Sequence, residues 1–105
     1  MGERRHELVR RSFGNAADPE TTRIDLVVRE DGGLSIDGVD MGPEVEASLG
    51  DFDLEYRLDV APGHGDRLLT AVLRHAMNRD EALTFEGLRE LCRAEGIPFD
   101  EVSWT

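Results

Sequence analysis

The chain has 105 residues and carries 23 acidic side chains against 12 basic ones, for a formal net charge of −11. A chain of this length predicts one domain that buries enough surface to fold without a structural metal or disulfide. The charge argues against a general nucleic-acid binder, which needs a basic face to displace counterions. The sequence has no apolar run near the roughly 20 residues of a membrane helix, so we expect no membrane partner.

The N-terminal residues 1–22 predict a flexible or partly helical arm. Residues 3–13 carry four arginines with only weak apolar spacing, which is compatible with a short helix. Residues 14–22 are small and polar and contain Pro19, which is typical of a linker. We therefore expect residues 23–105 to form a single α+β domain.

Alternating apolar and polar residues predict the strands of that domain. Residues Ile24–Arg29 and Leu34–Asp37 alternate on either side of Asp31-Gly32-Gly33, which predicts a β-hairpin. The strictest alternation covers Asp53–Val60 and predicts a strand with one apolar and one charged face. Residues 99–104 could form a last short strand.

Three helices are predicted between and after these strands. A short helix begins at Gly42-Pro43. An amphipathic helix runs to about Asn78 with Asp66 as its N-cap, and another runs from its cap Thr84 to Glu95. The order of strands and helices along the chain predicts a two-layer α+β fold. In it, two C-terminal helices cover an antiparallel sheet of three or four strands.

Acidic side chains concentrate in the predicted sheet. Residues 25–66 contain twelve acids and only two arginines, for a local charge of −10. Three hypotheses explain this charge: a solvated face that prevents self-association, a docking face for a basic partner protein, or a site for a divalent cation. The candidate partner-binding residues follow one strand: Asp51, Asp53, Glu55, Arg57 and Asp59.

The chemistry-bearing residues predict no catalytic group and no cofactor. His64 and Asp66 are weak candidates for a metal site, because a zinc site needs at least three protein ligands and no third one is in register. Cys92 falls late on the apolar side of its predicted helix, where packing is its expected role. A single cysteine and the lack of an apolar segment after Arg10-Arg11 predict a cytoplasmic protein.

Two stretches resemble a pattern found in small uncharacterised bacterial proteins. The first runs from Ile36 to Val45, with Gly50-Asp51 and Glu55-Tyr56 after it, and the second runs from Gly96 to Trp104. The resemblance covers residues 23–105 and implies no activity.

These observations favour a non-enzymatic protein-binding or regulatory module that uses an acidic sheet face. One alternative is an immunity-type inhibitor of a basic toxin, by analogy of size and charge with small acidic bacterial proteins. Another is a small metal-dependent enzyme or metal-binding module around His64 and Asp66. We expect a monomer or a homodimer, the latter closed by a sheet edge or by the strand around Trp104.

Overall fold

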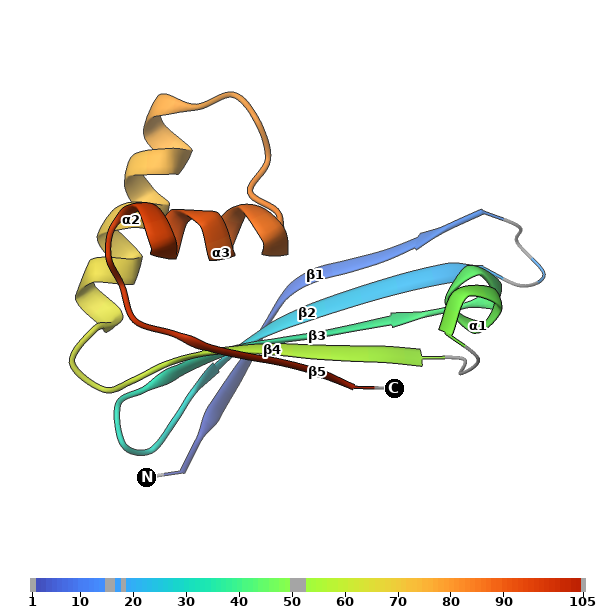
Figure 1. The fold of residues 1–105 in the computed structure, drawn as a ribbon, viewed down its shortest axis with the longest axis horizontal. Helices are drawn as coiled ribbons and strands as arrows, with labels where there is room; N and C mark the ends of the chain where they lie inside the picture. Colours follow the sequence, from blue (N-terminus) through green and yellow to red (C-terminus); the bar gives the residue numbers. More distant parts are fainter. Residues whose placement is uncertain (1, 15–16, 18, 50–52, 105) are drawn as a thin grey trace.

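A computed structural model describes residues 2–14, 17, 19–49 and 53–104 of the chain. Within these residues the strands form one five-stranded antiparallel sheet in which neighbours in sequence are neighbours in space (Figure 1). The strands are β1 (Arg4–Phe13), β2 (Glu20–Val28), β3 (Leu34–Met41), β4 (Asp53–Val60) and β5 (Asp100–Trp104). The predicted hairpin, the strand over 53–60 and the last short strand are all present.

The helices are α1 (Pro43–Leu49), α2 (Gly65–Asn78) and α3 (Phe85–Ala94). Helices α2 and α3 lie together on one side of the sheet, and α1 lies toward the other end of it (Figure 1). The expected α+β architecture, a sheet covered by C-terminal helices, is therefore confirmed. None of the helices in the described ranges is long and apolar enough to cross a membrane.

The core forms where the helices meet the apolar face of the sheet. Alternate residues of β3 and β4 point to this side, and Leu58 and Val60 are completely buried there. Buried side chains of the sheet, the helices and the final loop make one cluster: Ile36, Leu58, Val60, Leu68, Ala71, Leu88, Cys92 and Ile97. No helix of the described residues lies on the opposite face of the sheet, which we call the outer face (Figure 1).

The N-terminal segment corrects the prediction of a flexible or partly helical arm over residues 1–22. Residues Arg4–Phe13 form an edge strand that pairs with β2, with Arg5 opposite Val27 and an irregularity between Glu7 and Val9. Nine of its ten residues are exposed. A strand without a buried face shows no apolar alternation, so its sequence does not reveal it.

The helix starts agree only in part with the predicted caps. Thr84 is the N-cap of α3, and its side-chain oxygen accepts a hydrogen bond from the backbone N–H of Gly87 at 2.9 Å, as predicted. The prediction for α2 is wrong, because the N-cap is His64 and makes no side-chain capping bond. Because the helix already begins at Gly65, Asp66 lies inside its first turn. There its negative charge stabilises the helix by interacting with the positive end of the helix dipole.

Candidate functional site

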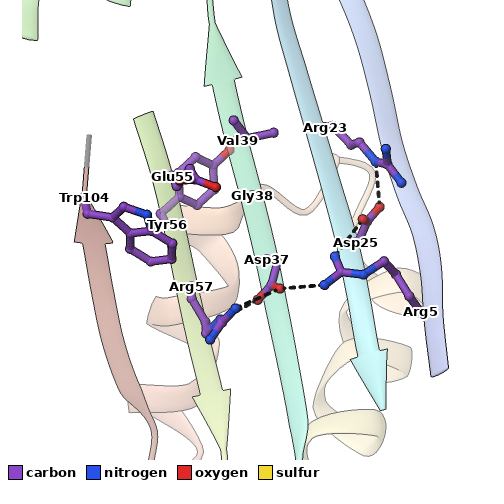
Figure 2. A pocket seen from close by; sticks show the side chains of 10 residues that line it. All are labelled: Arg5, Arg23, Asp25, Asp37, Gly38, Val39, Glu55, Tyr56, Arg57 and Trp104. Carbon is purple, nitrogen blue, oxygen red and sulfur yellow. Dashed lines mark hydrogen bonds and ion pairs between the residues drawn. The ribbon is translucent and has the colours of Figure 1, made fainter. Parts of the chain in front are cut away.

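The outer face brings together charged residues from the first four strands. Asp25 of β2, Asp37 of β3 and Arg57 of β4 lie opposite one another in register. Two carboxylates placed directly across a strand pair repel each other unless a cation separates them. Arg5 of β1 supplies that cation and reaches over β2 to both carboxylates (Figure 2).

These side chains form a continuous row that we call the charge ladder: Arg23, Asp25, Arg5, Asp37 and Arg57. Arg5 donates to Asp25 at 2.9 Å and to Asp37 at 3.2 Å. Arg23 Nε lies 3.2 Å from Asp25, and Arg57 Nε lies 2.8 Å from Asp37. Figure 2 shows the row running from Arg23 and Asp25 on β2 through Arg5 and across to Asp37 on β3 and Arg57 on β4. Each carboxylate therefore meets two guanidinium groups, which restrict the orientation of its side chain.

The electrostatics of the ladder centre on Asp25, whose relative exposure is only 4%. Burial alone would raise the pKa of this carboxyl, but the hydrogen bonds and charges of Arg5 and Arg23 outweigh burial and hold the pKa below its ordinary value. The hydrogen bonds to the aspartates also raise the pKa values of Arg5 and Arg57. These shifts favour the charged forms of Asp25, Arg5 and Arg57.

One end of the ladder borders Trp104 on β5. The guanidinium carbon of Arg57 lies 5.9 Å from the centre of the Trp104 ring, within the range of a cation–π contact. Trp104 also lies opposite Glu55 in the β4–β5 register. These residues and the ladder line a shallow depression of about 200 Å³ on the outer face (Figure 2).

The structure places the predicted partner-binding residues as follows. Glu55, Arg57 and Asp59 occupy alternate positions of β4, Asp53 begins the same strand, and Asp51 lies outside the described residues. Asp59 accepts a hydrogen bond from Arg29 Nη1 at 3.1 Å and another from the Ser35 hydroxyl. Arg57 is held by Asp37.

Two of the predicted partner-binding residues have carboxylates that are not engaged in ion pairs among the described residues. The carboxylates of Asp53 and Glu55 make no ion pair with any residue that the structure describes, and neither does Asp100 on β5. The outer face is therefore less acidic than the count over residues 25–66 suggests, because Arg5 and Arg23 add cations to it. Sequence reasoning missed Arg5, which becomes part of the face only once β1 is known to be a strand.

The remaining candidates from the sequence are the weak metal ligands His64 and Asp66 and the thiol of Cys92. Among the described residues no group of three or more His, Cys, Asp or Glu side chains is placed to hold a metal ion. His64 Nδ1 lies 3.4 Å from Arg67 Nη1, and Asp66 is exposed to solvent. Cys92 is fully buried, and burial raises the pKa of its thiol, which disfavours the nucleophilic thiolate.

No family model, curated protein or solved structure matches this chain. The resemblance of residues 36–45 and 96–104 to small bacterial proteins accordingly stays a prediction. The geometry of the outer face is what supports a function.

Proposed function

We propose that the protein is a non-enzymatic binding module whose outer sheet face docks a basic segment of a partner protein. The observation that supports this best is the ordered charge ladder, which ends beside the available carboxylate of Glu55 and the ring of Trp104. The side chains of the charge ladder are already held in place by their ion pairs, so little side-chain entropy is lost when a partner binds.

The chemistry of the partner follows from the groups that are free to bind. Asp53 and Glu55 are two residues apart on one strand, a spacing of about 7 Å. That spacing matches alternate side chains of an extended basic peptide. The Trp104 ring beside Glu55 adds an aromatic surface on which an arginine or lysine head group can lie. The net charge of −11 would also speed the approach of a basic partner.

An immunity-type inhibitor is the special case in which the basic partner is a toxin. A coding neighbourhood that contains a gene for a small basic toxin would support it. A neighbourhood without one would leave the general proposal intact and remove this special case.

The test is capture of a partner from the native host, followed by affinity measurements with the purified partner at low and raised salt. We expect affinity to fall with salt and to fall by about tenfold or more for Glu55→Arg, the scale of a lost and reversed charge pair. Glu86→Arg, which makes the same charge change on an exposed position of α3, is the control. Equal affinities for the two variants would contradict the proposal.

A further inference from the structure

Helix α2 carries a second row of apolar side chains that the core does not use. Leu69, Leu73 and Met77 follow one another at intervals of four residues and therefore share one side of the helix. Their relative exposures are 59%, 46% and 81%, whereas Leu68 and Ala71 on another side are buried in the core. Single exposed leucines are ordinary, but a contiguous apolar row is typical of an interaction surface. We call these three residues the α2 ridge.

The free charges at both ends of the ridge are negative. Asp66 lies three residues before Leu69, and Asp80 lies three residues after Met77. Both are exposed, and neither carboxylate makes an ion pair within the part of the chain that the structure describes.

The nearby arginines are engaged elsewhere. Arg67 Nη2 donates to the backbone carbonyls of Glu95 and Gly96, at 2.8 and 3.1 Å. Arg74 Nη1 pairs with the Glu95 carboxylate at 2.9 Å. These contacts direct Arg67 and Arg74 toward the end of α3, and the third nearby arginine, Arg79, has its Nη1 3.8 Å from the Glu81 carboxylate. None of the three forms an ion pair with Asp66 or Asp80 among the described residues.

This charge pattern argues against a second copy of the chain as the occupant. An antiparallel pair of α2 helices centred on Leu73 would place Asp66 of one copy near Asp80 of the other. A parallel pair would place each aspartate near its own counterpart. Either arrangement brings like charges together as apolar surface is buried, which opposes self-association.

We propose that the α2 ridge docks an amphipathic helix of another protein, with apolar residues three and four apart and lysine or arginine at both ends. Helices recognise one another through apolar side chains at this spacing. The basic ends would pair with Asp66 and Asp80. Helix α2 lies on the side of the sheet opposite the outer face (Figure 1), so this site is separate from the outer face and does not depend on its proposed function.

The probe is a fluorescently labelled synthetic helix of about four turns, with leucines three and four apart and lysines at both ends. A matched peptide replaces each lysine by glutamate. Binding to the full chain is followed by fluorescence anisotropy. We expect the lysine peptide to bind. The affinity of the glutamate peptide should be lower by about tenfold or more, because its glutamates meet Asp66 and Asp80 with like charge.

The variants separate the ridge from general attraction to an acidic protein. Leu73→Asn should lower the affinity for the lysine peptide about tenfold, which is the scale for removing one leucine from a buried contact. This substitution does not change the charge. Val102→Asn is the control, because it removes a comparably exposed apolar side chain (49%) from β5. It should leave affinity unchanged. Circular dichroism would establish that both variants keep the fold.

Three results would overturn the proposal. The first is no binding of the lysine peptide, and the second is equal binding by Leu73→Asn and the unaltered protein. The third is light scattering that shows a dimer abolished by Leu73→Asn, which would make a second copy the occupant. None of these results bears on the Glu55→Arg test, so the two sites fail or stand separately.

Discussion

Tyr56 and Gly38 lie directly opposite each other on β4 and β3, and the Tyr56 ring fills the space that a side chain at position 38 would need. The ring is held from two further sides. Its hydroxyl donates to Asp40 Oδ1 at 3.0 Å, and its edge contacts the ring of Phe85 on α3, with centroids 4.7 Å apart at 70°. One tyrosine thereby joins two strands and a helix.

Gly38→Ala should destabilise the protein by about 1–3 kcal/mol, the usual cost of an extra methyl group in a filled core. A Cβ at position 38 would overlap three atoms of the Tyr56 ring, which would have to move away from Asp40 and Phe85. Urea denaturation measures the loss. Gly65→Ala is the matched control, because its nearest neighbour would be Leu34 Cδ1 at 3.6 Å, an ordinary contact. Equal stability of both variants would contradict the close packing of Tyr56 on Gly38.

The Tyr56 phenol should ionise at higher pH than a free tyrosine. Burial raises its pKa, and the charge and hydrogen bond of Asp40 raise it further. Tyr56 is the only tyrosine, so ultraviolet absorbance near 295 nm reports on it alone. Since the folded state favours the neutral phenol, this stabilisation is complete below the unfolded pKa of about 10 and is lost as pH rises above it.

The titration of Tyr56 is therefore expected to follow alkaline unfolding. Asp40→Asn should lower the pKa of the phenol, because it removes the neighbouring negative charge. A native protein that forms phenolate near pH 10, as free tyrosine does, would contradict the buried placement.

The strands with the clearest alternation are those with one buried face, whereas β5, which was also expected, has five exposed residues. Alternation over residues 24–29 and 53–60 is strong because every second side chain must pack against α2 and α3. Strand β1 has no such requirement. Its polar side chains are selected by contacts with β2 and β3, and those contacts are not visible in the local sequence.

The candidate site could also be predicted only in part from the local sequence. Alternation alone puts Glu55, Arg57 and Asp59 on one side of β4. It does not say which cations meet the acids, because Arg5 is 32 residues from Asp37 and Arg29 is 30 residues from Asp59. Local charge counting therefore overestimated how acidic the face is.

Cys92 should react slowly with thiol reagents while the protein is folded. Its side chain is completely buried, and burial raises the pKa of the thiol. Both effects remove the accessible thiolate that attacks such reagents. Labelling with Ellman's reagent should therefore be slow in native buffer and should accelerate with urea in parallel with unfolding. Rapid modification of one thiol in native buffer would contradict the burial of Cys92.

Asp25→Asn should lower the free energy of unfolding by about 1.5–3 kcal/mol, the range for hydrogen bonds to a charged group. The buried carboxylate accepts from Arg5 and Arg23, and an asparagine keeps the shape but loses the charge and one acceptor oxygen. Glu55→Gln makes the same chemical change on the same face, at a carboxylate without an ion pair among the described residues. We expect Glu55→Gln to leave stability nearly unchanged.

The contribution of Asp25 should also depend on pH with a definite sign. The pKa of this carboxyl is lower in the folded protein than the unfolded value of about 3.9, so the unfolded state binds more protons as the solution is acidified. The stabilisation is therefore complete above about pH 5 and is lost as pH falls through the folded pKa. Urea denaturation of the unaltered protein and of Asp25→Asn over this range should show the stability difference shrinking toward acid pH. A difference that stays constant or grows as pH falls would mean that the arginines do not hold Asp25 in its ionised form.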